Sequence, residues 1–304
     1  MGLLDGKTIL ITGGGNGIGK ATALMAGELG ANVIVNDLGG SLSGADEGSA
    51  GPAEEVAAEI RAKGGSAISN SDSVTDFEAV KEMVESAKKE FGGLDSIINP
   101  AGILRDKMFH KMSEDDWDAV IAVHLRGSYN VARAAVEYFR DRENGNYVFF
   151  TSTSGLIGNI GQANYAAAKL GIVGLSRIIA MEGVRKNIRS NVIAPFAWTR
   201  MIASIPVTDE ASRERVERMK NAMRPEQVSN LALALCSDKC DTTGQIFAVR
   251  GNELVLFSQP RPVRSMANLE GWSPENILDT ALPAMKNDME DLGASASVFP
   301  YDPV

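Results

Sequence analysis

The chain has 304 residues, of which 44% are hydrophobic, so it can form the core of a large domain without disulfides or metals. Its formal net charge of −9 disfavours nucleic acid and anionic membranes as general partners. Two cysteines and two histidines are too few for a disulfide framework, a metal centre or a Ser–His–Asp hydrolase. We therefore expect no metal, and a small molecule as the partner.

No segment of the sequence indicates export or membrane insertion. The first residues lack the basic start and the long apolar run of a secretory signal, and no apolar run approaches the ~18 residues of a membrane span. The last residues, Tyr301–Val304, differ from the Ser-Lys-Leu peroxisomal signal. We therefore expect a cytoplasmic protein.

Taken in chain order, short apolar runs alternate with segments of helical spacing. The predicted strands are Thr8–Thr12, Asn32–Asn36, Ser66–Ser69, Leu94–Asn99, Tyr147–Ser152, Arg189–Ile193 and Gln245–Val249. The predicted helices are Lys20–Leu29, Ala53–Lys63, Asp76–Phe91, Ser113–Phe139, Ala163–Val184 and Glu226–Leu235. Because the strands are apolar throughout rather than alternating, helices should cover both faces of the sheet. The order predicts an α/β domain with a doubly wound parallel sheet of the Rossmann type.

Three regions differ from this alternation. Gly39–Pro52 is rich in glycine and serine and too long for an ordinary strand-to-helix loop, so we expect a flap or part of a ligand mouth. Pro195–Pro225 is apolar and then strongly charged, which fits a helical lid over a cleft. Pro260–Val304 contains prolines and is weakly periodic. The sequence therefore predicts one domain over residues 1–260 and a C-terminal extension over residues 261–304.

A glycine-rich segment joins the first predicted strand to the first predicted helix. Gly13, Gly17 and Gly19 hold the spacing T-G-x-x-x-G-x-G, and Asn16 and Ile18 lie between them. Glycines let the backbone approach a pyrophosphate, and the N-terminus of the following helix attracts phosphate. The context on both sides favours a dinucleotide site over a plain tight turn.

Asp37 ends the second predicted strand. A carboxylate there can accept hydrogen bonds from the ribose hydroxyls of adenosine, and it would repel a 2′-phosphate. Positions 16 and 38 carry no Arg or Lys that could neutralise such a phosphate. The sequence favours NAD over NADP, with a simple turn-forming role for Asp37 as the alternative.

Tyr165 and Lys169 lie one turn apart on a predicted helix and therefore share a face. A tyrosine with its ordinary pKa of ~10 is a poor acid or base near neutral pH, and a nearby lysine would lower that pKa. Alone, the pair could equally be a packed tyrosine beside a solvent-reaching lysine. Ser152 ends the fifth predicted strand, however, and the carboxyl ends of parallel strands meet at one edge of the sheet. Together these residues predict an acid–base centre for alcohol–ketone chemistry.

At this point the chain resembles the short-chain dehydrogenase/reductase family, over roughly residues 5–255. The segments that carry the resemblance are Thr12–Gly19, Asn99–Gly102, Ser152, Tyr165–Lys169 and Asn191–Pro195. A closer similarity is to the (3R)-hydroxyacyl-CoA dehydrogenase domains of peroxisomal multifunctional enzymes. It is carried by Asn36–Gly40, Ala101–Phe109, Val123–Ser128 and Gly158–Gly171.

The resemblance implies a role for each matching residue. Tyr165 would be the general acid and base, Lys169 would hold the nicotinamide ribose and lower the tyrosine pKa, and Ser152 would bond the substrate oxygen. Further cofactor contacts are implied for Asp72, Ser73, Asn99, Pro195 and Thr199.

Two positions depart from the pattern of the family. Pro100 replaces a usual asparagine and can alter the turn beneath the cofactor, because proline lacks an N–H group and has a fixed φ. The family usually has an asparagine at the position of His124, where it anchors a water that relays protons to the lysine. His124 is therefore either a fourth catalytic residue or a plain buried helix residue.

The reaction implied by the resemblance is hydride transfer between nicotinamide and a secondary alcohol or ketone. We expect a 3-hydroxyacyl-CoA, fatty acyl or steroid-derived, which would place the protein in fatty acid β-oxidation or steroid metabolism. The alternatives are a hydroxysteroid dehydrogenase acting on a free alcohol, and a catalytically silent nucleotide-binding scaffold. An apolar substrate wall is one interpretation, and core packing the other, for Phe196, Trp198, Met201, Ile202 and Ile205. Family members pair two long helices between subunits, so we expect a homodimer or homotetramer.

Overall fold

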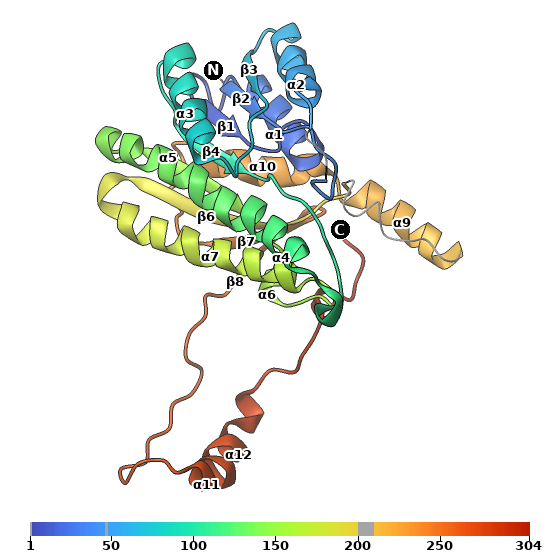
Figure 1. The fold of residues 1–304 in the computed structure, drawn as a ribbon, viewed down its shortest axis with the longest axis vertical. Helices are drawn as coiled ribbons and strands as arrows, with labels where there is room; N and C mark the ends of the chain where they lie inside the picture. The colour runs from blue at the N-terminus through green and yellow to red at the C-terminus, as the bar shows by residue number, and fades with distance from the viewer. Residues whose placement is uncertain (1, 46–47, 200–209) are drawn as a thin grey trace.

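The computed structural model describes residues 2–45, 48–199 and 210–304, which form an α/β body and a long C-terminal arm (Figure 1). The body is built on an eight-stranded sheet in the order β3-β2-β1-β4-β5-β6-β7-β8. The strands are β1 (Thr8–Ile11), β2 (Asn32–Asn36), β3 (Ser66–Asn70), β4 (Ser96–Asn99), β5 (Gly145–Phe150), β6 (Ile188–Phe196), β7 (Ile246–Arg250) and β8 (Glu253–Phe257). All pairings are parallel except the last, between β7 and β8. The predicted doubly wound fold is confirmed.

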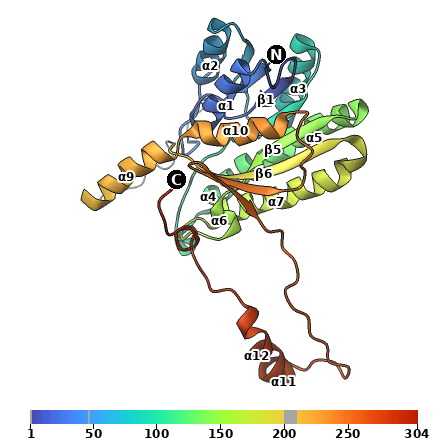
Figure 2. The same ribbon diagram turned by 180° about the vertical axis from the view of Figure 1, so that it is seen from behind.

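Helices cover both faces of the sheet. In the body they are α1 (Gly17–Glu28), α2 (Gly51–Ala62), α3 (Phe77–Phe91), α4 (Glu114–Ile121), α5 (Gly127–Arg142), α6 (Thr153–Leu156), α7 (Ala163–Gly183), α9 (Glu210–Ala222) and α10 (Pro225–Cys236). Helices α3, α5 and α7 pack on one face, with α5 and α7 in front in Figure 1, whereas α1, α2 and α10 pack on the other face (Figure 2).

The sequence of the strand β1 shows why helices must cover both faces of the sheet. Ile9 and Ile11 point into the core with α1, α2 and α10, whereas Leu10 between them points into the core with α3, α5 and α7. All three side chains are fully buried. Successive side chains of a strand point to opposite faces, so a strand with no polar position must be covered twice.

The helix predicted over Ser113–Phe139 is continuous, but it is not α-helical throughout. Ser113 caps its start in a capping box with Asp116, as the sequence predicts. A π-helical segment, η2 (Ala122–Arg126), then separates α4 from α5, and the helix runs on to Arg142. Such a segment changes the direction in which the following side chains point and often occurs at functional sites. Here it carries His124.

The strand β8 was not predicted, and it turns the edge of the sheet antiparallel. Arg250 pairs with Glu253, so Gly251 and Asn252 form a two-residue turn between β7 and β8. Gly251 adopts a φ of +60°, which glycine allows without strain. The Gly-Asn pair is a hairpin signal that the sequence analysis missed.

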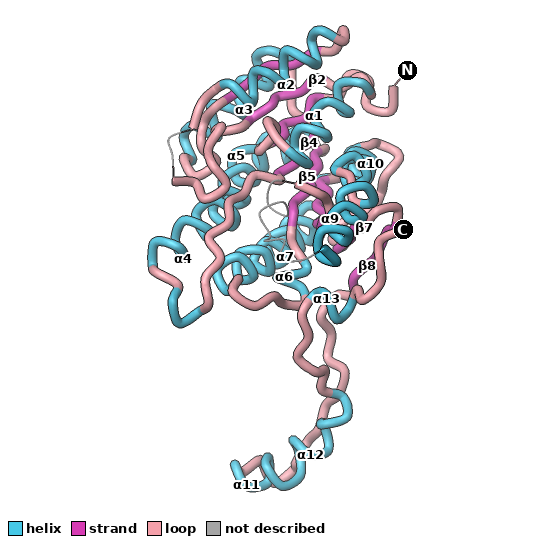
Figure 3. Tube along the Cα trace, turned by 90° about the vertical axis from the view of Figure 1, so that its right-hand side faces the viewer, coloured by secondary structure: helices cyan, strands magenta, loops and turns pink. Residues whose placement is uncertain are grey.

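The chain after β8 leaves the body as an extended arm (Figures 1 and 3). The arm carries α11 (Pro274–Asn276) and α12 (Leu282–Met285), and it then returns to the body through α13 (Ser295–Val298). The backbone N–H of Ser295 donates to the carbonyl oxygen of Gly158 at 3.1 Å, which ties the returning chain to the body. The boundary proposed at residue 260 stays a prediction. Within the described ranges, no helix is both long and apolar enough to cross a membrane.

Candidate active site

A cavity of about 450 Å³ opens at the carboxyl ends of the parallel strands. Most of the residues predicted for the site line this cavity, namely Gly13, Asn16, Gly17, Ile18, Gly19, Asp37, Asp72, Ser73, His124, Tyr165, Lys169, Pro195 and Thr199. Ser152 and Asn99 are not among its lining residues. Gly40, Ser41, Leu42 and Gly44 also line it, which places the segment predicted as a flap or ligand mouth at the edge of the cavity.

The glycine loop between β1 and α1 has room for backbone only. A Cβ atom at Gly19 would lie 2.0 Å from the carbonyl oxygen of Gly13, and one at Gly13 would lie 2.9 Å from the Cα of Ala101. Gly13 and Gly17 adopt φ values of +58° and +51°. The side chain of Asn16, which precedes α1, makes no capping hydrogen bond. These features fit a loop that presents backbone N–H groups to a phosphate group.

Both oxygens of Asp37 are held by backbone groups at the rim of the cavity. They accept hydrogen bonds from the N–H groups of Gly15 at 2.8 Å and Gly39 at 2.7 Å. The neighbouring Asn36 donates to the carbonyl oxygen of Asp72 at 2.8 Å, and this bond joins the ends of β2 and β3. The carboxylate of Asp37 is therefore fixed where the adenosine end of a dinucleotide would lie.

Tyr165 and Lys169 lie at the inner end of the cavity, one turn apart on α7. The Nζ atom of Lys169 is 5.4 Å from the ring centre of Tyr165 and donates to the carbonyl oxygen of Phe150 at 2.8 Å. Burial lowers the pKa of Lys169 to about 7. The amine can therefore be neutral or charged at physiological pH, which suits a group that passes a proton on.

Burial also raises the pKa of Tyr165 to about 12, while a hydrogen bond with Ser152 acts to lower the pKa and the charge of Asp106 raises it. The expected lowering of the tyrosine pKa by Lys169 stays a prediction.

Ser152 is positioned by the turn that follows β5. It caps the short helix α6, where its Oγ atom accepts a hydrogen bond from the backbone N–H of Ser154 at 3.1 Å. Its hydroxyl also acts on Tyr165, whose pKa it lowers through side-chain hydrogen bonding. A serine and a tyrosine hydroxyl that meet beside a cavity can both bond one substrate oxygen.

Asn99 is buried at the end of β4, and its implied contact with the cofactor stays a prediction. Its Oδ1 atom accepts a hydrogen bond from the hydroxyl of Thr12, and its Nδ2 atom donates to Ser128 Oγ at 2.9 Å. The Ser128 hydroxyl in turn donates to the carbonyl oxygen of His124 at 2.6 Å. The amide of Asn99 is therefore engaged within the protein, where it braces the glycine loop against the helix that carries His124.

His124 is buried, and its ring lies edge-on to Tyr165 with 5.1 Å between the ring centres. Its Nε2 atom is 3.1 Å from the backbone nitrogen of Ile103 and 2.8 Å from the carbonyl oxygen of the same residue. The Nδ1 atom is buried and has no partner among the described residues. Burial lowers the pKa of His124 well below 6.5, with a further contribution from Lys169, so the ring is neutral. Gly102 provides the space for it, since a Cβ there would lie 2.2 Å from His124 Cε1.

The apolar wall predicted after β6 is only partly described. Phe196 and Trp198 are half-buried, and the Phe196 ring packs against Phe299 from the C-terminal arm with 5.1 Å between ring centres. Met201, Ile202 and Ile205 lie outside the described residues. The charged part of the predicted lid forms α9.

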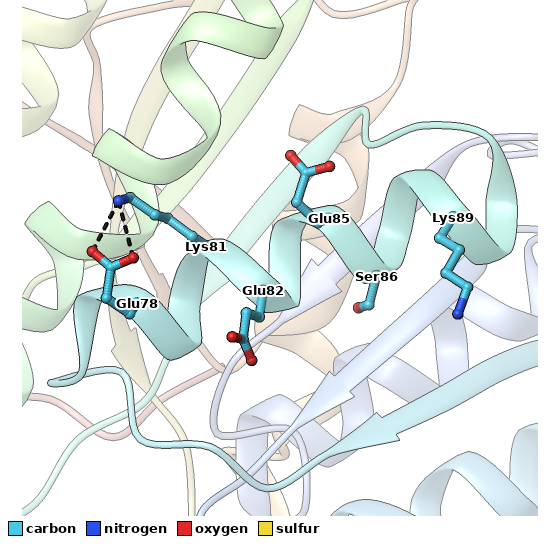
Figure 4. A pocket seen from close by; sticks show the side chains of 6 residues that line it. All are labelled: Glu78, Lys81, Glu82, Glu85, Ser86 and Lys89. Atoms are coloured by element: carbon cyan, nitrogen blue, oxygen red, sulfur yellow. Dashed lines mark hydrogen bonds and ion pairs between the residues drawn. The ribbon is translucent and has the colours of Figure 1, made fainter.

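A second hollow, along α3, has a different character (Figure 4). All of its lining residues, Glu78, Lys81, Glu82, Glu85, Ser86 and Lys89, come from that one helix. Lys81 pairs with Glu78 at 2.9 Å and points away from the others. Because α3 alone contributes lining residues in the described part of the chain, this hollow is a solvated helix face and not a binding site.

Comparison with known proteins agrees with this geometry. The family model described as short chain dehydrogenase matches residues 7–206. The chain is 46% identical to the peroxisomal multifunctional enzyme type 2 of Mus musculus over 245 residues, which are 81% of this chain and 32% of the mouse enzyme. It is also 46% identical to a short-chain type dehydrogenase/reductase of Mycobacterium tuberculosis, over 86% of this chain and 91% of that protein.

The same similarity extends to a solved structure. The crystal structure of a short chain dehydrogenase from Mycobacterium avium superposes with a TM-score of 0.83 at 35% identity, and the match covers 96% of this chain and 99% of that one. The chain spans about a third of the length of the mouse enzyme it matches. Members of the matched family are oxidoreductases that typically bind NAD or NADP. The chain belongs to the short chain dehydrogenase family.

Proposed function

We propose that the chain is an NAD-dependent dehydrogenase that interconverts a 3-hydroxyacyl-CoA and its 3-oxoacyl counterpart. One observation carries this proposal. Tyr165 and Lys169 line the same cavity as the glycine loop and Asp37, so an acid–base pair shares one site with a loop that suits a dinucleotide. The sequence similarity to (3R)-hydroxyacyl-CoA dehydrogenase domains supports the substrate class.

In the oxidation direction, Tyr165 would take the proton of the substrate hydroxyl and Ser152 would donate a hydrogen bond to the same oxygen. A bound NAD would supply the hydride acceptor for this chemistry. The alcohol thereby loses one proton and one hydride, and a ketone remains. In the reduction direction, Tyr165 would return the proton to the carbonyl oxygen. Such general acid–base catalysis contributes roughly 10²–10⁴-fold to the rate.

Lys169 and His124 would carry the tyrosine proton onward. Lys169 has a pKa of about 7 and can hold or release a proton beside the Tyr165 ring. For His124, the N–H and carbonyl groups of Ile103 both lie at Nε2, so either tautomer of the neutral ring keeps a hydrogen bond there. The Nδ1 atom is then free to accept or donate a proton. This favours a relay role for His124 over that of a plain buried residue.

The choice of NAD over NADP rests on Asp37. Its fixed carboxylate would accept hydrogen bonds from the ribose hydroxyls and repel a 2′-phosphate. Asn16 and Leu38, which also line the cavity, carry no positive charge to offset that repulsion.

The proposed substrate class has further support from a relative. A hydroxyacyl-CoA dehydrogenase of Mycobacterium tuberculosis is 36% identical to this chain, over 91% of it. An acyl-CoA of fatty acid or steroid origin is the substrate that this similarity favours. A 3-hydroxyacyl-CoA dehydrogenase of this kind would act in β-oxidation.

The direct test is a substrate panel read at the NADH absorbance band. Purified protein is given NAD or NADP with (3R)- and (3S)-hydroxyacyl-CoAs of several chain lengths, and with free hydroxysteroids. We expect turnover of hydroxyacyl-CoAs with NAD, and much less with NADP. Turnover of free steroid alcohols alone would contradict the acyl-CoA assignment, and preference for NADP would contradict the role of Asp37. A lack of turnover with every substrate of the panel would contradict the proposal that the chain is an enzyme.

A further inference from the structure

A chain of hydrogen bonds leads away from Ser152 and ends at a carboxylate. The hydroxyl of Ser152 lies 3.2 Å from Ser154 Oγ, and the hydroxyl of Ser154 lies 2.7 Å from Gln162 Oε1. The Nε2 atom of Gln162 then donates to Asp106 Oδ2 at 2.7 Å. None of these three further residues lines the cavity, and the proposed reaction does not use them.

Backbone and side-chain bonds align the segments that carry this chain. The N–H of Lys107 donates to the carbonyl oxygen of Gly161 at 2.9 Å, so the loop after β4 runs beside the start of α7. Asn164, one residue before Tyr165, donates to the carbonyl oxygen of Arg105 at 3.1 Å. Asp106 and Gln162 are therefore held together by the fold and not only by their own flexible side chains.

The carboxylate sets the direction of the whole chain. An ionised carboxylate only accepts hydrogen bonds, so Gln162 must turn its NH₂ group to Asp106 and its oxygen to Ser154. Ser154 must then donate its single hydroxyl hydrogen to Gln162. Asn159 donates to Ser154 Oγ at 2.9 Å, so the Ser154 oxygen is the acceptor in that bond as well. Toward Ser152, the hydroxyl of Ser154 can act only as an acceptor.

Ser152 has one hydroxyl hydrogen, and in the absence of substrate two groups compete for it. It can donate to Ser154, or it can donate to the oxygen of Tyr165 and stabilise the phenolate. We propose that Asp106 is a positioning residue that works through Gln162 and Ser154 to draw the Ser152 hydrogen away from Tyr165. Asp106 would thereby keep Tyr165 in its protonated form. This inference rests on the proposed function only for its catalytic consequence.

The charges around Tyr165 act in the same direction. Three titratable groups face the tyrosine, namely Lys169 on α7, His124 on η2 and Asp106 in the loop after β4. The negative charge of Asp106 raises the pKa of Tyr165, so its removal would lower it. Asp106 makes no ion pair within the described ranges, and its side chain is exposed, so solvent screens part of this effect. The bond chain and the charge both favour the acid form of Tyr165.

Alcohol oxidation needs Tyr165 deprotonated, so its rate rises with pH through the tyrosine pKa. We expect Asp106→Asn to move this rise to lower pH by roughly 0.5–1 pH unit. Ser154→Ala removes the competing acceptor and keeps the charge, so we expect a smaller shift of the same sign. If Asp106 acts through the bond chain, Asp106→Asn must shift the rise less in the Ser154→Ala background than in the native protein. Asp118→Asn removes an exposed carboxylate on α4 and serves as the control.

A second readout keeps this test separate from the proposed reaction. The ultraviolet phenolate band of Tyr165, taken as the difference between each variant and its Tyr165→Phe counterpart with NAD present, titrates whether or not any substrate turns over. If Asp106→Asn shifts the Tyr165 pKa equally in the native and the Ser154→Ala backgrounds, charge alone acts and the proposal is overturned. The absence of a shift in both Asp106→Asn and Ser154→Ala would also overturn it. Should Asp106→Asn fail to fold by circular dichroism, Gln162→Met breaks the same chain with the same expected sign. A protein that turns over no alcohol would contradict the proposed function, whereas the phenolate titration would still test the role of Asp106.

Discussion

Lys169 is held almost out of solvent, with 4% of its surface exposed and the Phe150 carbonyl oxygen as hydrogen-bond acceptor. A buried amine costs stability because its charged form is desolvated. We expect Lys169→Met to raise the free energy of unfolding at pH 7 by about 1–3 kcal/mol while it removes activity. Such a trade between stability and function is common at catalytic sites.

The stability gained in Lys169→Met should depend on pH, because the pKa of Lys169 differs between the folded and unfolded states. The folded-state pKa of Lys169 is about 7, below the ordinary value of 10.5 for lysine, so the unfolded chain binds the proton more tightly between these values. The advantage of Lys169→Met should therefore be largest below pH 7 and shrink as the pH rises toward 10.5. Urea unfolding of both proteins at several pH values measures it. An advantage that stays constant with pH would contradict the burial argument.

Single residues were predictable where a local pattern fixed their role. The glycine loop, Asp37, Tyr165 and Lys169 follow from spacing and from the rule that strand ends meet at one edge. The environment of Asn99 was not predictable, because it depends on the hydroxyls of Thr12 and Ser128 from other elements. The bond chain to Asp106 joins residues 56 positions apart and needs the folded backbone.

At the scale of elements, the segment after β2 is fastened to the loop after β4. Arg105 donates to the carbonyl oxygens of Ser43 at 2.8 Å and Gly44 at 3.5 Å, and also to that of Asp115 at 3.2 Å. The N–H of Leu104 bonds the carbonyl oxygen of Leu42 at 2.9 Å. Because Leu42 and Gly44 line the cavity, Arg105 holds this segment at the edge of the site.

We expect Arg105→Ala to loosen that segment and to speed NADH release by roughly 3–10-fold, since each lost hydrogen bond is worth about 1 kcal/mol. Stopped-flow fluorescence of bound NADH measures the rate. The matched control is Arg140→Ala, which removes an exposed arginine on α5. Release no faster than in that control would show that Arg105 does not hold the segment over the cofactor.

The elements themselves were largely predictable, and the exceptions have physical causes. Most of the seven predicted strands are apolar runs because both of their faces are buried, whereas the edge strand β3 is partly exposed. The edge strand β8 is also an apolar run in the sequence, and it was missed together with the Gly-Asn turn before it; its Leu254 and Leu256 are exposed because they face outward at the sheet edge. The π-helical segment around His124 could not be predicted, since a shift in backbone hydrogen bonding has no residue signature.

At the scale of the whole molecule, the outer face of α7 is apolar. Ile178 and Met181 are 50% and 67% exposed, and Leu170 on the same helix is 51% exposed. Exposed apolar patches on globular domains often mark contact surfaces. This supports the predicted homo-oligomer, with α7 as part of the contact between subunits.

We expect a carboxylate in this face to weaken the assembly, because burying an unpaired charge at an interface is costly. Met181→Glu should give a smaller species than the native protein in light scattering at equal concentration. Ala58→Glu, on the exposed face of α2, adds the same charge elsewhere and should leave the size unchanged. A native protein that is already monomeric would contradict the prediction.

The central claim is that Tyr165 moves the substrate proton. The most direct measurement compares kcat/KM for the best substrate of the panel, and the affinity for NAD, between the native protein and Tyr165→Phe. We expect Tyr165→Phe to lower kcat/KM by about 10²–10⁴-fold and to leave the NAD affinity largely unchanged, because only the hydroxyl is removed. A kcat/KM that stays within about tenfold of the native value would contradict it.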